Sequence, residues 1–276
     1  ADGPRCADGY AWWDGRSFTG LDGWTAEGDT SGYWLLPLQP QASASAKYVV
    51  LLTAGQVSSA QDIEAAIKRA TAEGTRPGTV ILDGGDGPFV YSGDDRSINV
   101  FVSNLTLLGV NGAKIENCGD GLFFDSFSQE NILVEGIEFV CSGNGVSTSS
   151  AITGVTLRGN IFQTMLASIS LGGETSDWLI ELNLLKSFSN GIEVLGASQM
   201  VIRRNYISAW EGIVLRQSSD LRITGNRIDS QRWGIHLLQE SSQNWVEKNV
   251  INYEQYAGII LVEGVKDNQI LSNTVS

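Results

Sequence analysis

The chain has 276 residues, of which 42% are hydrophobic, and its formal net charge is −13 at pH 7. This hydrophobic content is ample for a core, and the acidic charge argues against nucleic acid as a partner, because phosphate binding needs an excess of Lys and Arg. The sequence also predicts no transmembrane segment, since no apolar run approaches the roughly 20 residues that span a bilayer.

Residues 1–46 differ in composition from the rest of the chain. They contain four of the eight tryptophans among Gly, Asp and Ser, without a clear period: Trp12, Trp13, Trp24 and Trp34. We expect a loop-rich flank that packs on the following domain, because buried aromatic side chains dominate cores. Direct contact of these aromatics with sugar rings is the alternative.

The second predicted domain, residues 47–276, opens with a strand at 48–52 and one helix at about 59–73. Ser59 can cap this helix with Asp62 at the third helical position, an acidic variant of the capping box. Its apolar face consists of Ile63, Ala66, Ile67 and Ala70. Gly74 should end the helix, and a strand should follow at 79–82.

From residue 98 onward the chain reads as short strands in a repeat of 21 to 27 residues. The motif Gly-Ile-x-Leu or a close variant begins at Gly191, Gly212, Gly234 and Gly258, at steps of 21, 22 and 24. An asparagine row keeps the same period: Asn160, Asn183, Asn205, Asn226, Asn249 and Asn273. Each repeat is too short to fold alone, so the repeats must stack as coils and bury their apolar residues against one another.

The alternation within the motif assigns inward and outward positions. Ile and Leu flank one outward residue, so both point into the core. The glycine should lie at a corner that needs a positive φ or close backbone approach. The asparagines should bond the turn backbone and their copies one coil away. About seven or eight coils are expected, and these rows are structural.

The residues from Gly212 to Ile228 and from Gly234 to Ile251 carry a family resemblance. Their pattern, Gly-Ile-x-Leu, then Ser-Ser, then Asn-x-Ile, resembles the right-handed parallel β-helix repeat of the pectate-lyase-like superfamily, and especially the periplasmic repeats of copper-accessory proteins. The segment 62–82 resembles the cap helix and first strand that open such domains. The resemblance implies an all-β, single-stranded right-handed parallel β-helix with one N-terminal capping helix.

The resemblance implies no single activity, because members of this superfamily include lyases, hydrolases, epimerases and tailspikes. The motifs that carry catalysis in polygalacturonases, pectate lyases and alginate epimerases are absent. Candidate site residues must therefore come from the outward positions of the coils.

A basic cluster is the most unusual charge feature. Six of the 18 Lys and Arg residues lie within 30 positions: Arg203, Arg204, Arg216, Arg222, Arg227 and Arg232. An enzyme that acts on a uronate needs cations to neutralise the carboxylate and a base to take the C5 proton, which in this superfamily is often Arg or Lys. We therefore predict a catalytic site for an anionic sugar at Arg203, Arg216 and Arg222, with His236 and Glu193. Ion pairing with Asp220, Asp229 and Glu240 along a solvated face is the alternative.

His236, the single histidine, occupies the outward position of its motif, in a row with Ser170, Glu193, Val214 and Ile260. It could act as a general acid or base, or be a plain surface residue. Trp210 and Trp233 should stack at one corner, with Tyr256 near the equivalent place. With Arg232 they are the predicted substrate-binding residues, although such a ladder also serves packing.

One histidine excludes most zinc and copper centres, so no metal or cofactor is predicted. A calcium site is left open around Asp83, Asp86, Asp94 and Asp95. Cys118 and Cys141 lie one repeat apart, which brings them within reach of a disulfide, but two buried thiols fit the spacing equally well. Cys6 would then be left over.

We predict a secreted or cell-surface carbohydrate-active protein, a lyase or hydrolase of an acidic polysaccharide, and the sequence leaves open whether it is an enzyme. The alternative is a structural or adhesive β-helix such as a tailspike or filament module. It could assemble end to end, because the repeat runs to Ser276 and suggests an uncapped coil. Ice binding is disfavoured, since the outward row at His236 lacks regular threonines.

Overall fold

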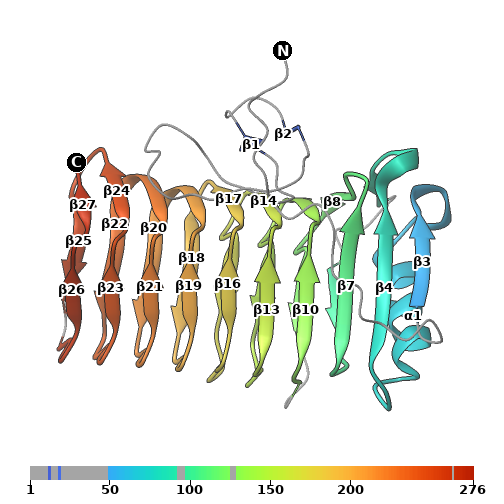
Figure 1. The fold of residues 1–276 in the computed structure, drawn as a ribbon, viewed down its shortest axis with the longest axis horizontal. Coiled ribbons are helices and arrows are strands. Elements are labelled where there is room, and N and C mark those ends of the chain that lie inside the picture. Colours follow the sequence, from blue (N-terminus) through green and yellow to red (C-terminus); the bar gives the residue numbers. More distant parts are fainter. Residues whose placement is uncertain (1–11, 14–17, 20–48, 92–96, 125–128, 263) are drawn as a thin grey trace.

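The computed structural model describes residues 12–13, 18–19, 49–91, 97–124, 129–262 and 264–276. From Val49 onward these residues form a parallel β-solenoid of about eight turns, stacked along one axis with α1 at its N-terminal end (Figure 1). The predicted all-β parallel β-helix with an N-terminal cap helix is confirmed. The predicted flank 1–46 lies outside the described residues except for β1 (Trp12–Trp13), which pairs antiparallel with β2 (Phe18–Thr19).

One long face of the solenoid is a ten-stranded parallel sheet, here called sheet C, with β3 and β26 at its edges. Its strands are β3 (Val49–Thr53), β4 (Gly78–Asp83), β7 (Leu105–Val110), β10 (Ile132–Glu135), β13 (Val155–Arg158), β16 (Leu179–Glu181), β19 (Val201–Arg203), β21 (Arg222–Thr224), β23 (Trp245–Glu247) and β26 (Gln269–Leu271).

The remaining strands form two further faces that are joined through the long strands β20 (Tyr206–Arg216) and β22 (Arg227–Leu238). Before the corner within β20 and β22, the second face contains β5 (Phe89–Val90), β8 (Lys114–Cys118), β11 (Glu138–Cys141), β14 (Ile161–Thr164), β17 (Leu184–Ser187), β24 (Val250–Tyr253) and β27 (Thr274–Val275). After this corner, the third face contains β6 (Ile98–Val100), β9 (Leu122–Phe124), β12 (Val146–Thr148), β15 (Ile169–Leu171), β18 (Asn190–Leu195) and β25 (Ala257–Leu261).

The core lies inside the coils, where the sequence pattern places the apolar residues. On sheet C one inward row is fully buried from coil to coil: Val80, Leu107, Val134, Leu157, Ile180, Ile202, Ile223 and Val246. Gly212 and Gly234 lie where an added Cβ would come within 2.4 Å of the next coil's carbonyl oxygen. Close approach, and not a positive φ, therefore explains these corner glycines.

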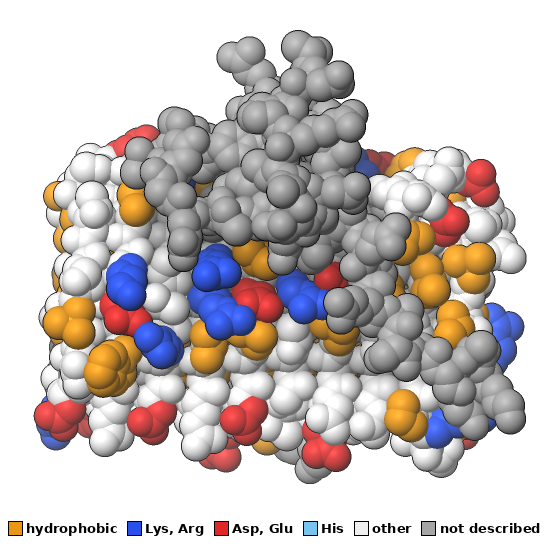
Figure 2. Space-filling view, viewed as in Figure 1, with side chains coloured by type: hydrophobic (Ala, Val, Ile, Leu, Met, Phe, Trp, Pro, Cys, Tyr) orange, Lys and Arg blue, Asp and Glu red, His pale blue; other side chains and the backbone are white. Residues whose placement is uncertain are grey.

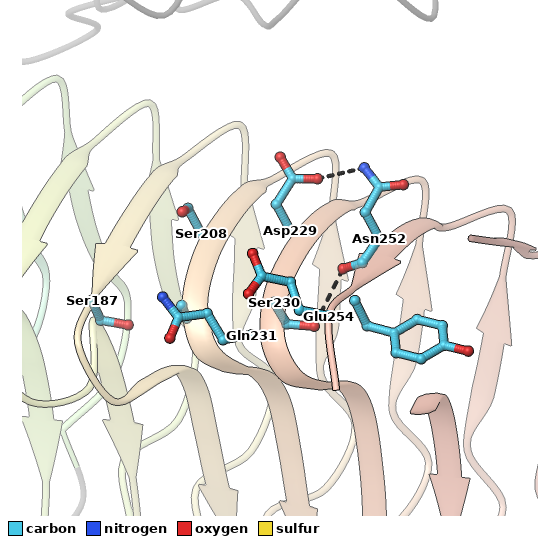
Figure 3. Close-up of a pocket in the computed structure, with 9 residues that line it drawn as sticks. Ser187, Ser208, Asp229, Ser230, Gln231, Asn252 and Glu254 are labelled. Atoms are coloured by element: carbon cyan, nitrogen blue, oxygen red, sulfur yellow. Dashed lines mark hydrogen bonds between the residues drawn. The ribbon is translucent and has the colours of Figure 1, made fainter. Parts of the chain in front are cut away.

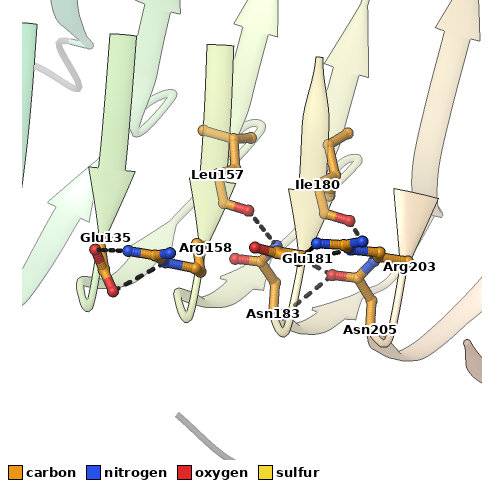
Figure 4. Close-up of polar contacts among 8 residues, drawn as sticks. All are labelled: Glu135, Leu157, Arg158, Ile180, Glu181, Asn183, Arg203 and Asn205. Atoms are coloured by element: carbon orange, nitrogen blue, oxygen red, sulfur yellow. Dashed lines mark hydrogen bonds and ion pairs between the residues drawn. The ribbon is translucent and has the colours of Figure 1, made fainter. Parts of the chain in front are cut away.

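The asparagine row is a continuous buried ladder. From Asn160 to Asn249, each Nδ2 donates to the Oδ1 of the next asparagine at 2.9–3.2 Å. The same oxygen also accepts the preceding asparagine's backbone N–H, as Asn183 does for Asn160 at 2.9 Å. Figure 4 shows Asn183 and Asn205 bonded in this way, with Nδ2 of Asn183 reaching the Leu157 carbonyl. The ladder thus satisfies the polar groups of a buried corner.

Helix α1 (Ala60–Thr71) begins as predicted, with Ser59 and Asp62 in a reciprocal capping box. Its end differs from the prediction, because Ala72 is the left-handed cap, with a φ of 46°, two residues before Gly74. The single-turn helices η2 (Ala54–Gln56) and η3 (Gly84–Asp86) lie at the same end of the stack.

Cys118 and Cys141 form a disulfide between adjacent strands β8 and β11, which decides the question that their spacing left open. Across the described ranges, no helix has the length and hydrophobicity of a membrane span.

Candidate functional site

Two of the predicted catalytic arginines lie on the outer face of sheet C and are paired with glutamates. Arg203 on β19 contacts Glu181 at 2.6 Å, and Arg222 on β21 contacts Glu247. Arg158 makes the same contact with Glu135 at 2.7 Å (Figure 4). Each pair joins two adjacent coils and neutralises charge across this face.

The Arg158–Glu135 and Arg203–Glu181 pairs belong to a row of alternating charge along sheet C, which also includes Glu247 but not Arg222. The row runs Glu135, Arg158, Glu181, Arg203, Thr224 and Glu247 in consecutive register. Figure 2 shows Lys and Arg beside Asp and Glu side chains across the middle of this face. The pairing matches the solvated-face alternative of the sequence analysis, although the partners are glutamates of neighbouring coils.

Five other predicted site residues come together on the third face: Glu193, Arg216, Arg232, Trp233 and His236. Together with Glu211 and Tyr256 we call them the histidine cluster. Arg216 contacts Glu193 at 3.4 Å. The rings of Trp233 and His236 lie 4.5 Å apart, and Arg232 lies 3.7 Å above Trp233. The structure therefore joins these residues and separates them from Arg203 and Arg222.

The predicted row at His236 shares one register, which runs through Ser170, Glu193, Val214, His236 and Ile260, although Val214 is fully buried. The His236 side chain is only 12% exposed, so it is not a plain surface residue.

Glu211 is the member of the cluster that sequence reasoning missed. Its carboxylate is buried, lies 3.1 Å from Arg232 and 4.0 Å from Nδ1 of His236. Burial raises its pKa, and the Arg232 charge only partly opposes this. A buried carboxylate beside a histidine is the electrostatic signature of many functional sites and of structural ion pairs alike.

Replacing Arg232 with methionine should destabilise the protein by about 2 kcal/mol at neutral pH, because Glu211 would be left buried without its cation. Burial already raises the pKa of Glu211 in the folded state, and the substitution should raise it further. A raised carboxyl pKa penalises folding above that pKa, so acidification should restore stability. Urea denaturation at neutral and mildly acidic pH measures this, and a loss that grows on acidification would contradict it.

The predicted stacking of Trp210 on Trp233 is wrong by one residue. Glu211, and not Trp210, is the register partner of Trp233, because the register shifts between Ala209 and Glu211, where β22 has one residue more than β20. Trp233 instead contacts His236 and Tyr256, whose ring lies 5.7 Å away.

A separate groove lies on the second face, and sequence reasoning missed it. We call it the β22 groove; its volume is about 360 Å³, and it is lined by Ser187, Ser208, Ala209, Asp229, Ser230, Gln231, Asn252, Tyr253 and Glu254. These residues come from four consecutive coils, on β17, β20, β22 and β24 and the segment after it (Figure 3). The lining combines hydroxyls, amides and two carboxyl groups.

Asp229 is held in a fixed orientation within the groove. Tyr206 donates its hydroxyl to Oδ2 at 2.6 Å, and Asn252 donates Nδ2 to Oδ1 at 2.6 Å. Arg227 lies 3.8 Å from Oδ2. Both carboxylate oxygens therefore have donors, while Glu254 on the next coil is exposed. Glycoside hydrolysis uses two carboxyl groups, and the lining of the β22 groove contains two, Asp229 and Glu254.

The β22 groove and the histidine cluster are neighbours along the chain. Gln231 of the groove directly precedes Arg232 and Trp233, and Glu254 lies two residues before Tyr256. The two features therefore occupy neighbouring parts of one corner.

The sequence model of the family described as "Periplasmic copper-binding protein (NosD)" matches residues 84–258, more than half of the chain. The chain belongs to the NosD family. This membership agrees with the resemblance of the repeats to periplasmic copper-accessory proteins.

Two kinds of relative place this NosD-family chain further. "Uncharacterized protein YclG" of Bacillus subtilis (strain 168) is 31% identical over an alignment of 172 residues that covers 58% of this chain and 27% of YclG. The chain thus spans about a quarter of the length of this curated relative. Among solved structures, DFA-IIIase from Arthrobacter chlorophenolicus A6, without its lid and in complex with GF2, is 12% identical over 82% of this chain and 80% of that chain, with a TM-score of 0.50. The Dettilon tailspike protein is 15% identical over 75% of this chain and 51% of that chain, with a TM-score of 0.45.

The donors among the described residues do not fit the copper in the family description. Soft sulfur ligands and imidazole bind copper in proteins, yet the whole sequence has one histidine and two methionines. Met200 is buried in the core, Met165 is exposed, and Cys118 and Cys141 are oxidised together. Among the residues the structure describes, no group of three or more His, Cys, Asp or Glu could hold a metal ion.

Of the four predicted calcium ligands, Asp83 already has hydrogen-bond partners within the protein. Asp83 already accepts hydrogen bonds from Gly85 N and Asn111 Nδ2, both at 2.9 Å, and these bonds lower its pKa. Asp94 and Asp95 lie outside the described residues.

We expect the purified chain to retain well under one copper per molecule after incubation with Cu(II), or anaerobically with Cu(I), and desalting. The reason is the lack of a second imidazole or a free pair of thiolates among the described residues. Elemental analysis measures the retained copper. One copper per chain that survives desalting, and is lost in His236→Gln, would contradict this expectation.

Proposed function

We propose that the chain is a carbohydrate-active β-helix protein that binds a polysaccharide in the β22 groove and hydrolyses it. The carrying observation is the pairing of Asp229 and Glu254 within one polar groove that spans four coils. Sugars are recognised by hydroxyl, amide and carboxylate groups that line a concave site. DFA-IIIase, which has a similar fold, was solved in complex with GF2, and this supports a ligand-binding role for the scaffold.

In this proposal Asp229, fixed by Tyr206 and Asn252, either takes the proton of an attacking water or forms a glycosyl ester that water then hydrolyses. The exposed Glu254 donates the proton to the leaving oxygen. Gln231 and Ser208 would hold sugar hydroxyls. Because the groove is lined by hydroxyl, amide and carboxyl groups, it could bind a neutral sugar.

The predicted lyase acting on an acidic polysaccharide stays a prediction with less support. Arg203, Arg216 and Arg222, its proposed cations, each contact a glutamate. A uronate would have to displace these partners before it could use the arginines.

The family description and the disulfide Cys118–Cys141 support a location outside the cytosol, because disulfides persist in oxidising compartments. We propose the periplasm or the cell exterior, including the secreted or surface location that the sequence analysis predicted.

The test is a panel of soluble polysaccharides incubated with the purified chain: xylan, mixed-linkage β-glucan, galactomannan, inulin, alginate and pectin. New reducing ends without ultraviolet-absorbing unsaturated products would support hydrolysis. Unsaturated products would favour the lyase. Binding without either product would favour the adhesive alternative, and neither binding nor cleavage across the panel would refute the proposed function.

A further inference from the structure

An exposed apolar ridge follows the corner between the second and third faces, beside the β22 groove. We define the corner ridge as Met165, Leu166, Phe188 and Trp210. Phe188 is 78% exposed and Trp210 39%, and the two aliphatic members are more than half exposed. Single exposed apolar residues are normal, but a contiguous row of large ones marks an interaction site.

Backbone hydrogen bonds show that the ridge members lie on consecutive coils. Phe188 N donates to the Thr164 carbonyl, next to Met165, at 3.2 Å. Trp210 N donates to the Ser189 carbonyl, next to Phe188, at 2.9 Å. The ridge therefore advances by one strand spacing, about 4.8 Å, with each coil.

The fold does not need these side chains. On the same coils the core is filled by other residues, since Phe162, Leu185 and Ile207 are fully buried in one inward row. The ridge side chains lie outside this core, where exposure of an aromatic surface costs solubility without stabilising the coil.

The ridge and the groove overlap along the stack. Phe188 directly follows Ser187, and Trp210 directly follows Ala209, both of which line the groove. A ligand along this corner would therefore meet apolar surface on one side and hydroxyl, amide and carboxyl groups on the other. A sugar ring has this combination, with an apolar C–H face and a rim of hydroxyls.

We infer that the corner ridge is a stacking subsite, on which a polysaccharide lies along the solenoid axis with its sugar rings against Phe188 and Trp210. The inference rests on the proposed function and adds the direction and length of the bound chain. From Met165 to Glu254 the corner covers four coil steps, or about 19 Å. Affinity should thus rise with oligosaccharide length until this span is filled.

Native gels that contain xylan, mixed-linkage β-glucan, galactomannan or inulin test the inference, with Trp245→Ala as the matched control. Trp245 has an exposed fraction similar to that of Trp210, 43% against 39%, but it lies on sheet C. We expect Phe188→Ala and Trp210→Ala each to weaken retention about tenfold, as for aromatic contacts at binding sites. Trp210→Phe should keep most of the binding, and Trp245→Ala should match the wild type.

The possible failures are distinguishable. If the wild type is retained but both ridge variants match Trp245→Ala, the ridge inference is overturned and the groove proposal stands. If no polymer retains the wild type, both are overturned. If the ridge variants leave retention intact but convert a dimer to a monomer in light scattering, the ridge is an interface between copies and the inference is again overturned.

Discussion

Replacing Asn226 with leucine should lower the free energy of unfolding by about 4 kcal/mol. Its Oδ1 accepts the backbone N–H and Nδ2 of Asn205, both at 3.0 Å, and its Nδ2 donates to the Ile202 carbonyl at 2.9 Å and to Asn249 Oδ1 at 3.0 Å. Leucine would leave these buried groups without their partner, and each unsatisfied group costs about 1 kcal/mol or more.

Gln163→Leu is the control, because this amide is exposed on β14 and bonds only Glu138 among the described contacts. It should change stability by less than about 0.5 kcal/mol. Urea denaturation followed by far-ultraviolet circular dichroism measures both variants. If Asn226→Leu loses no more stability than Gln163→Leu, the asparagine ladder is not a main support of the stack.

Asp229→Asn should reduce hydrolysis of a cleaved polysaccharide about a thousandfold while leaving the fold intact. The amide keeps the shape of the side chain but can neither accept a proton nor attack the sugar. Glu254→Gln should have a comparable effect if it supplies the proton to the leaving group.

Asp220→Asn is the matched control for this loss. Asp220 is exposed, lies outside the groove and has a φ of 59°, a left-handed conformation that asparagine tolerates. Initial rates of reducing-end formation, with melting temperatures for each variant, separate catalysis from folding. Equal rates for Asp229→Asn and Asp220→Asn would remove Asp229 from the mechanism.

The fold was predictable because its signals repeat. Ile202, Ile223 and Val246 follow the period of the coils, and so does the asparagine ladder. A repeat supplies many copies of the same signal, and each copy must stack on the next to bury its core. The cap helix was predictable from Ser59 and Asp62 for a local reason, the capping box.

The candidate site was only partly predictable. Glu193, Arg216 and His236 could be grouped because they lie on consecutive or alternate coils of one face. The partners of Arg203 and Arg158 could also have been found, since Glu181 and Glu135 lie 22 and 23 residues earlier, one coil away.

The corner was harder to predict because its length varies between coils. The one extra residue of β22 at this corner moves Trp210 out of register with Trp233 and puts Glu211 beside Trp233. Counting back from Gly212 and Gly234 would have given this pairing. No sequence pattern predicted the β22 groove, because it is formed jointly by side chains from four coils.

The central claim is that a polysaccharide occupies the β22 groove, and carboxyl footprinting tests it most directly. The chain is treated with a water-soluble carbodiimide and an amine, with and without a saturating oligosaccharide of the polymer it binds, and labelled residues are quantified by mass spectrometry. The account predicts several-fold protection of Asp229 and Glu254, while Asp220 is labelled equally in both samples. Protection confined to Glu181 and Glu247 on sheet C, with Asp229 and Glu254 unchanged, would contradict it.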